Sequence, residues 1–208
     1  MAISVQELFD EFDLNMSGPV KWGEKLKANY SGVYVIALTN DPTSKDSHKL
    51  PFEINKSVFD RWIEVSENLE IGGEKVTSIK QVQKHLKQFW DEDENILYIG
   101  ESSSATSSVQ KRVNQYYKHK VGNKGTHSGG YWLKLISQLS DVCVYHAEAI
   151  NPRETEFKMI MKFVEKRAGK SFYEIENFSN YFPFANIKVD VLKSHLVSYD
   201  KKGTGPKK

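Results

Sequence analysis

Apolar residues fall along this chain in blocks whose spacing predicts both strands and helices. Residues 32–38 are almost all apolar and rich in β-branched side chains, as in a buried strand, and residues 96–100 and 141–149 also predict strands. Apolar residues three or four positions apart predict helices over 57–69, 78–90, 109–119 and 131–139. Together with the length of 208 residues, this pattern predicts a single domain, 1–208.

Capping residues predict where two further helices begin. Ser4 and Glu7 form a capping-box pattern ahead of helically spaced apolar residues, and we expect this helix to end before residue 18. Asn151 and Pro152 predict the start of a long helix, because Asn is a good N-cap and Pro suits the first helical position. The predicted core face of that helix is Phe157, Ile160, Met161 and Val164. Residues 185–192 predict a last strand, and the polar tail 201–208 is expected to be mobile.

Residues 40–95 are predicted to be a helical insertion between the first two strands. Phe59, Trp62 and Ile63 on its first helix face an apolar stripe on its second, so the two helices are expected to bury each other. That stripe consists of Ile79, Val82, Leu86, Phe89 and Trp90, and Gly72-Gly73 marks the turn before it. The insertion carries twelve acidic and eight basic side chains, and we expect the acidic loop 91–94 to be solvated. This balance predicts a role in specificity, pairing or stability rather than in bulk DNA affinity.

Charge is distributed unevenly, although the net charge is only +2. Residues 1–101 carry 11 basic and 18 acidic side chains, whereas residues 102–140 carry six basic side chains and no acid. The six are Lys111, Arg112, Lys118, Lys120, Lys124 and Lys134. An acid-free basic segment predicts a surface that faces phosphate, and the alternative is a solvated helix and loop.

The composition also excludes some classes of protein. No apolar run approaches the ~20 residues of a membrane span, and the N-terminus lacks the pattern of a signal peptide. Cys143 is the only cysteine, so an internal disulfide is excluded. We therefore expect a cytoplasmic protein with no membrane partner.

Phosphodiester hydrolysis needs an activated water, charge stabilisation on the phosphate and assistance to the leaving oxygen, and a metal ion held by carboxylate can supply the last two. Glu156 is the candidate metal ligand, because its helical neighbours are apolar and a carboxylate beside a buried stripe needs a partner. These neighbours are Met159, Ile160 and Phe163. The alternative is a carboxylate paired with Arg153 or Lys162.

Arg112 is the candidate for binding phosphate. It lies four residues before Tyr116, so the two side chains share a helix face. The alternative is an exposed surface arginine. Lys111 is expected to make a second phosphate contact, and Lys118, Lys120 and Lys124 are candidates for general contacts to a nucleic-acid backbone.

Two tripeptides, Gly32-Val33-Tyr34 and Tyr98-Ile99-Gly100, place a tyrosine on each of the first two strands. Most strand tyrosines only pack, but a tyrosine whose pKa of ~10 is lowered by nearby positive charge can accept a proton from water. The six histidines are scattered and show no metal-ligand spacing.

These features, in this order, resemble the GIY-YIG nuclease family, which is named for the two tripeptides. The likeness covers residues 30–38 and 95–187. It implies a small sheet packed by helices and DNA cleavage with one divalent cation, Mg²⁺ or Mn²⁺. It also implies that Tyr34 activates water as general base and that Tyr98 orients water or phosphate.

The resemblance assigns further roles to residues outside the tripeptides. Arg112 would stabilise the transition state, and Glu156 would bind the metal. Asn186, after Pro183, matches a Pro-x-x-Asn that often closes the family core, and it is carried over as a DNA-binding candidate. Tyr116 stands where many members have histidine, as it does in some restriction enzymes of the family. The 63 residues that separate the two tyrosines (35–97) are also typical of that branch.

We therefore expect an α/β (α+β) protein with a small, mostly antiparallel sheet flanked by helices. Its expected activity is metal-dependent hydrolysis of DNA, as a restriction or defence endonuclease, and a homodimer is left open. One alternative is a non-catalytic nucleic-acid-binding module on the same fold, which would have no need of Glu156. Another is a protein-interaction domain that uses the aromatic residues Trp62, Phe89 and Trp90 of the insertion.

Overall fold

A four-stranded antiparallel sheet forms the centre of the molecule, with strand order β1-β6-β2-β5. The computed structural model describes residues 2–45, 51–66, 69–71, 73–103, 107–121, 130–186, 188–189, 192–193 and 197–198. The helices are α1 (Val5–Asp10), α2 (Lys56–Val65), α3 (Ile79–Leu86), α4 (Val109–Lys118), α5 (Gly130–Leu135) and α6 (Pro152–Ala168). The strands of the central sheet are β1 (Ser17–Lys21), β2 (Gly32–Ala37), β5 (Ile96–Ser102) and β6 (Cys143–Glu148). Short strands lie at β3 (Glu70–Ile71), β4 (Glu74–Lys75), β7 (Lys188–Val189), β8 (Leu192–Lys193) and β9 (Val197–Ser198).

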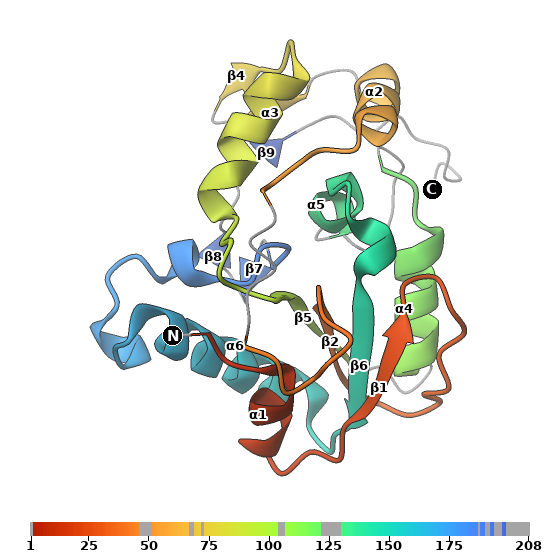
Figure 1. The fold of residues 1–208 in the computed structure, drawn as a ribbon, viewed down its shortest axis with the longest axis vertical. Helices are drawn as coiled ribbons and strands as arrows, with labels where there is room; N and C mark the ends of the chain where they lie inside the picture. Colours follow the sequence, from red (N-terminus) through yellow and green to blue (C-terminus); the bar gives the residue numbers. More distant parts are fainter. Residues whose placement is uncertain are drawn as a thin grey trace, which may run out of the picture.

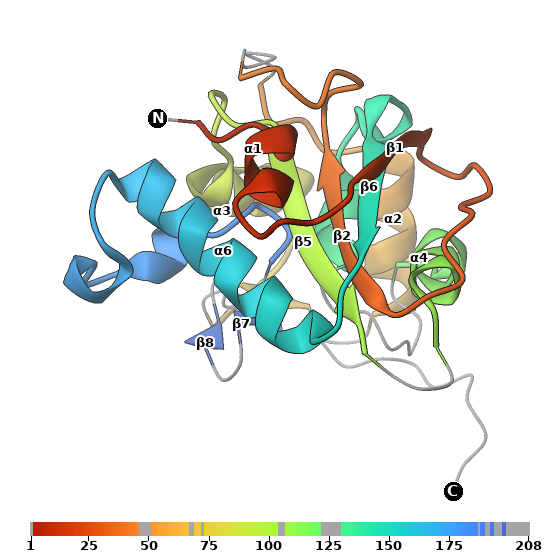
Figure 2. The same cartoon turned by 90° about the horizontal axis from the view of Figure 1, so that it is seen from below.

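Helices cover both faces of the sheet, which confirms the predicted α+β class (Figures 1 and 2). Side chains of β2 alternate between the two faces: Val33 and Val35 pack with α1 and α6, whereas Tyr34 and Ile36 pack in the layer that includes α4. Figure 2 shows α6 on one side of the sheet and α4 on the other. The tyrosines of the two tripeptides therefore belong to the α4 side.

The N-terminal helix is confirmed, but the strand that follows it was not predicted. The capping box of Ser4 and Glu7 forms as predicted, and α1 ends at Asp10, before residue 18 as expected. Residues 17–21 then form β1, an edge strand that pairs with β6 through an irregular register. The strand is mostly exposed and contains Gly18 and Pro19, so it lacks the apolar alternation that identifies a strand in a sequence.

The insertion forms both predicted helices, but they do not pack as an isolated pair. Between α2 and α3 the chain makes the β3–β4 hairpin around Gly73, whose φ of 83° suits glycine. Figure 1 shows α2 and α3 lying apart. Trp62 of α2 packs against Trp132 of α5 with ring centroids 5.8 Å apart, while Ile63 remains 37% exposed. The insertion thus packs on the core, and its two helices do not form an isolated pair.

The aromatic residues of the insertion are part of the core. Trp62 is fully buried, and Trp90 lies against Phe52 and Phe184 with ring centroids 5.4 and 5.1 Å away. Phe89 is partly buried against the same cluster. An interaction surface built on these three side chains therefore has little exposed area to offer.

Three smaller expectations also change. The buried face of α6 is Met159, Ile160, Phe163 and Val164, whereas Phe157 is 39% exposed and Met161 is half-buried. Residue 185 lies in a turn, and the predicted strand over 185–192 is replaced by the β7–β8 pair. The tail 201–208 lies outside the described residues.

The acidic loop 91–94 is only partly solvated. Asp91 forms an ion pair with Arg167 of α6 at 2.9 Å, and Glu94 is 7% exposed. This loop binds α6 to the start of β5, so two of its acids have structural partners. Among the described helices, none is long and apolar enough to cross a membrane.

Candidate active site

Strands β2 and β5 bring the two tripeptides together. Tyr34 lies opposite Gly100, and Tyr98 lies opposite Ile36, in the antiparallel register. The rings of Tyr34 and Tyr98 are 5.8 Å apart between centroids. A Cβ at Gly100 would lie 2.8 Å from the Tyr34 hydroxyl oxygen and 2.5 Å from the Tyr98 ring. The glycine of the second tripeptide is therefore required by the close approach of the two tyrosine side chains.

Helix α4 adds Arg112 and Tyr116 to this pair. The hydroxyl of Ser108 caps the helix by accepting from the Lys111 backbone N–H. The N–H groups of Val109 and Gln110 donate to carbonyls of residues 30 and 28, which fixes the start of α4 beside β2. Tyr116 stacks on Tyr98 at 5.5 Å, and half-buried Arg112, one turn earlier, is close enough to influence both strand tyrosines.

Glu156 reaches the same place from α6. It lies in the second turn of the helix, on the edge of the face that buries Met159 and Ile160. Its charge influences both Tyr34 and Tyr98, and the charge of Arg112 influences Glu156. The five residues expected to carry chemistry therefore gather around the end of β5 where α4 and α6 meet the sheet: Tyr34, Tyr98, Arg112, Tyr116 and Glu156.

The alternative ion pair for Glu156 with Lys162 does not form. Lys162 instead pairs with Glu11, which follows α1, at 2.5 Å. Burial raises the pKa of Glu156 to about 8, with the negative charge of Glu101 adding to the shift and Arg112 and Arg153 opposing it. The net upward shift means that these two arginines offset only part of the cost of charging the carboxyl.

Glu101 is the residue that the sequence reasoning missed. It is half-buried on β5, directly after the second tripeptide, and one of its carboxylate oxygens, Oε2, is buried without a hydrogen-bond partner among the described residues. The signal in the sequence was the position of Glu101 directly after Gly100, which places a carboxylate next to the second tripeptide. The face of the sheet on which Glu101 lies depends on its pairing with Val33, and the sequence alone does not specify that pairing.

Burial raises the pKa values of the clustered tyrosines. The pKa of Tyr34 lies well above its usual value, and Tyr98 and Glu156 act in the same direction as burial, against Arg112. Burial likewise raises the pKa of Tyr98 and of Tyr116. Tyr34 is 0% exposed. In this arrangement Tyr34 is a neutral phenol, and the lowered pKa on which a general-base role depends is not present.

A buried histidine lies beside Tyr34 on the neighbouring strand. His146 of β6 is opposite Tyr34, and its Nδ1 forms a hydrogen bond of 2.5 Å with the hydroxyl of Tyr30. Burial lowers the pKa of His146, which favours the neutral imidazole. The hydrogen-bonded pair of Tyr30 and His146 therefore lies on the β6 side of Tyr34.

The basic residues divide between surface and interior. Lys111, Lys118 and Lys120 are exposed on or just after α4, as a phosphate contact requires, and Lys124 lies outside the described residues. Lys134 is buried on α5, where its Nζ donates to the carbonyl of Tyr117 at 3.1 Å and to that of His119. Desolvation lowers its pKa to about 8. Lys134 thus ties α5 to the end of α4 and does not belong to a DNA-facing surface.

Asn186 also differs from its expected place. Its side-chain Oδ1 accepts from the Ile99 N–H at 2.9 Å, and its Nδ2 donates to the Ile99 carbonyl at 2.8 Å. The residue is 3% exposed, so it pairs with the free edge of β5 instead of reaching DNA. The expected DNA contact by Asn186 is therefore wrong, because a buried amide with both atoms engaged by backbone has nothing to offer a phosphate.

The donor set at this site suits a hard divalent cation. Glu156 supplies a carboxylate with no direct hydrogen bond or ion pair among the described residues, and the unpartnered Oε2 of Glu101 lies near it. Oxygen ligands of this kind are those that Mg²⁺ and Mn²⁺ prefer. The described part of the chain holds no group of three or more metal-binding His, Cys, Asp or Glu side chains, so water and substrate would have to complete the coordination.

Comparison with known proteins adds no relative. No family model matches the chain, and neither the curated proteins nor the solved structures contain a match. Function is therefore supported by the residues and geometry of the site itself.

Proposed function

We propose that this protein is a metal-dependent endonuclease of the GIY-YIG type that hydrolyses phosphodiester bonds in DNA. The observation that carries the proposal is the meeting of four residues, Tyr34, Tyr98, Arg112 and Glu156, from four separate elements, β2, β5, α4 and α6. A carboxylate, a guanidinium and two phenols in one place provide what phosphodiester cleavage requires. Packing alone gives no reason to place the charged pair beside the buried tyrosines.

Each residue has a role that its surroundings support. Arg112 is half-buried, and its fixed positive charge would bind the scissile phosphate and stabilise the charge that develops on it. Tyr98, also half-buried, would donate its hydroxyl proton to a phosphate oxygen or orient the attacking water. Tyr116 supports Tyr98 through the stacked rings. Glu156 would hold Mg²⁺ or Mn²⁺, which when bound polarises the phosphate and makes a bound water more acidic.

The role of Tyr34 follows from its neutral, buried state. Its hydroxyl would serve as a fixed hydrogen-bonding group that orients water, and not as a phenolate that removes a proton at neutral pH. Exposed Lys111, Lys118 and Lys120 would contact the DNA backbone around the site. Use in restriction or defence, and a cytoplasmic location, which the single buried Cys143 favours, belong to the same proposal.

A second candidate, a non-catalytic nucleic-acid-binding module on the same fold, is favoured by the burial of the Tyr34 hydroxyl. A nicking assay separates the two. We expect the purified protein to convert supercoiled plasmid or unmethylated phage DNA to nicked or linear forms with Mg²⁺ or Mn²⁺ and not with EDTA. Glu156→Gln should abolish cleavage and keep DNA binding, and Glu154→Gln, an exposed residue paired with Lys158 on the same helix, is the matched control. DNA binding without any metal-dependent cleavage would establish the binding module instead.

A further inference from the structure

Two carboxylates approach each other where β5 ends beside α6. Glu101 lies opposite Val33 in the sheet, and Val33 and Ile99 both face α6. Because alternate residues of a strand share a face, Glu101 lies on the same side as Ile99. Glu156 is on the inner edge of α6, and the two charges influence each other. Strand and helix thus each present one acid to the same space.

Positive charge offsets only part of the negative charge of this pair. Glu101 Oε2 is buried without a hydrogen-bond partner among the described residues, and Glu156 forms no hydrogen bond or ion pair with them. A buried carboxylate oxygen left unpaired is costly. Arg112 and Arg153 act to lower the pKa of Glu156, but burial and the charge of Glu101 outweigh them.

A third polar group is buried at the same end of β5, on the α4 face of the sheet. The Tyr34 hydroxyl is completely buried, and the Tyr98 side chain is the one described group that acts on it by hydrogen bonding. The Tyr34 hydroxyl lies over Gly100, where a Cβ would come within 2.8 Å of its oxygen, and Gly100 precedes Glu101. The charge of Glu156 reaches this hydroxyl. The unpartnered carboxylate oxygen of Glu101 and the like charge of Glu156 at one strand end indicate that a positively charged ligand completes the site.

We propose that Glu101 is a second carboxylate ligand, so that Glu101 and Glu156 together hold one divalent cation, Mg²⁺ or Mn²⁺. This inference rests on the proposed endonuclease function and assigns its metal to two protein ligands instead of one. Two carboxylates neutralise a divalent charge, and Mg²⁺ is commonly held by one or two carboxylates with water and substrate phosphate in the other positions. The unpaired oxygen at the end of β5 is then a ligand atom and not a defect of packing.

Direct measurement of Mn²⁺ binding tests this assignment without relying on cleavage. Mn²⁺ would be titrated into wild-type protein, alone and with a phosphorothioate duplex that resists hydrolysis, and free Mn²⁺ would be followed by electron paramagnetic resonance. We expect one tight site in the wild type, and about tenfold or greater loss of affinity in both Glu101→Gln and Glu156→Gln. The control Glu154→Gln, exposed on the same helix, should bind like the wild type.

Thermal unfolding provides an independent test of Mn²⁺ binding. Without metal, Glu101→Gln should be at least as stable as the wild type, because it removes one of two like charges. With Mn²⁺ the wild type should gain stability and Glu101→Gln should lose that gain. If Glu101→Gln fails to fold, Glu101→Asp keeps the charge, shortens the side chain, and should bind Mn²⁺ more weakly than the wild type.

The outcomes separate this inference from the function on which it rests. Wild-type affinity for Mn²⁺ in Glu101→Gln, with loss in Glu156→Gln, would overturn the role of Glu101 and leave the proposed nuclease intact. A wild-type protein that neither binds Mn²⁺ nor cleaves DNA would overturn both. Parallel loss of Mn²⁺ affinity in the two variants, with an unchanged control, would support a site made of both carboxylates.

Discussion

The two ends of β5 both carry buried acids, and the acids differ in how they are satisfied. Before the strand, Glu94 Oε1 accepts from the N–H groups of Asn95 and Ile96 at 2.9 and 3.1 Å. At the other end, the charge of Glu101 near the end of β5 influences Glu156 of α6, and Glu101 Oε2 has no hydrogen-bond partner among the described residues. Burial raises the pKa of Glu94 to about 7 and that of Glu156 to about 8.

The neighbours of the two ends explain the difference. At the first end, the backbone hydrogen bonds and Arg167 oppose the effect of burial on Glu94, and Arg167 is itself held by Asp91 and by the Phe182 carbonyl. At the second end, Glu101 adds like charge to the effect of burial on Glu156. A buried acid with its hydrogen bonds made is explained by the fold, whereas one left with like charge and an open oxygen indicates a ligand.

The largest difference should be in catalysis. Glu156→Gln should lower Mg²⁺-dependent cleavage by roughly 1,000-fold, or about 4 kcal/mol in activation free energy, because the amide is a poor ligand for a hard cation. Glu94→Gln should stay within about threefold of the wild type, since it lies at the other end of the strand. Initial nicking rates at saturating Mg²⁺ measure both. Equal losses of cleavage rate in Glu156→Gln and Glu94→Gln would mean that the acids at the two ends of β5 do not differ in their role in catalysis.

The comparison also indicates what a sequence can and cannot reveal. The strands of Tyr34 and Tyr98 and the helices of Arg112 and Glu156 were predicted correctly, because local spacing and capping residues specify them. The strand β1 was missed because an exposed edge strand with Gly and Pro has no apolar alternation. Local sequence patterns predicted which residues lie on each strand or helix. Which of these residues come into contact depends on how the strands and helices pack together.

Long-range contacts account for the other errors. Asn186 and Lys134 are polar residues whose partners, the Ile99 backbone and the end of α4, are distant in sequence. Glu94 was placed in a solvated loop because its backbone partners are buried only once β5 enters the sheet. The raised pKa of Tyr34 could not be predicted, because nearby charge can be inferred from the sequence whereas depth of burial cannot.

The next largest effect concerns the free edge of β5 between its two ends. The backbone N–H of Ala185 donates to the Leu97 carbonyl at 2.8 Å, and Asn186 continues this pairing at Ile99. Asn186→Leu should lower the free energy of unfolding by roughly 2–4 kcal/mol, because it removes two hydrogen bonds and leaves buried backbone groups unpaired. Urea unfolding measures the loss, with exposed Asn180→Leu as control. A loss below that of the control variant would mean that the amide pairing is unimportant.

A smaller effect should appear in the pH dependence of stability. The pKa of Glu94 is raised to about 7 in the folded protein from a model-peptide value near 4.5. Between these values the folded state binds more protons than the unfolded state, so the contribution of Glu94 is present below about pH 4.5 and is lost as pH rises through 7. Glu94→Gln keeps the Oε1 acceptor and removes the charge. It should therefore stabilise the protein by about 2 kcal/mol at pH 8.5 and by much less at pH 5.

Urea unfolding of Glu94→Gln and wild type at the two pH values tests this sign, with Glu92→Gln, exposed in the same loop, as control. Asp91 raises the pKa of Glu94 and Arg167 lowers it, so both must remain in place for the comparison to hold. A wild type that gains stability relative to Glu94→Gln as pH rises would show that the carboxylate is favoured in its charged form.

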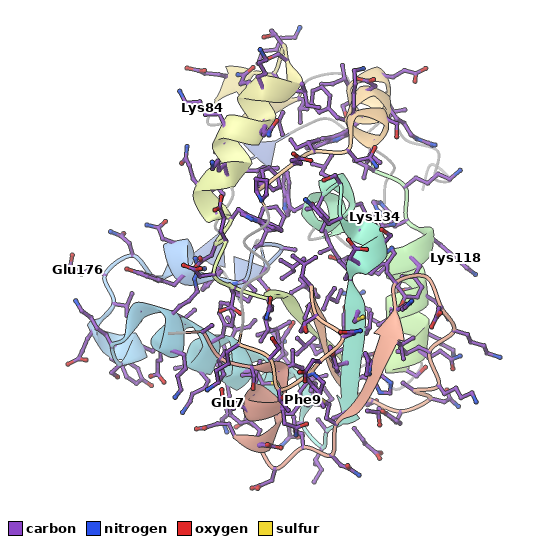
Figure 3. All side chains as sticks on the ribbon, viewed as in Figure 1. Glu7, Phe9, Lys84, Lys118, Lys134 and Glu176 are labelled. Carbon is purple, nitrogen blue, oxygen red and sulfur yellow. The ribbon has the colours of Figure 1, made fainter. Side chains whose placement is uncertain are left out.

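The smallest effect should be in DNA binding, where the helix before β5 is compared with the helix after it. Figure 3 shows Lys84 on α3 and Lys118 on α4 on opposite sides of the molecule. Only α4 contributes to the tyrosine cluster, and the insertion that contains α3 has more acids than bases. Lys118→Glu should weaken binding to a duplex by about five- to tenfold and reduce its salt dependence, whereas Lys84→Glu should change it less than about twofold.

Lys111→Glu should likewise weaken DNA binding more than Lys80→Glu does. Each of these lysines lies in the first turn of its helix, and the two substitutions change the charge equally. Fluorescence anisotropy with a labelled duplex at several salt concentrations, using Glu156→Gln to prevent cleavage, gives both the affinity and the salt slope. The affinity of a surface that contacts the DNA backbone falls as the salt concentration rises, and the slope of this fall grows with the number of phosphates that the surface neutralises. Only the α4 variants should therefore reduce the slope. Equal losses from the two helices would mean that the insertion is itself a main DNA contact and that both ends of β5 face the nucleic acid.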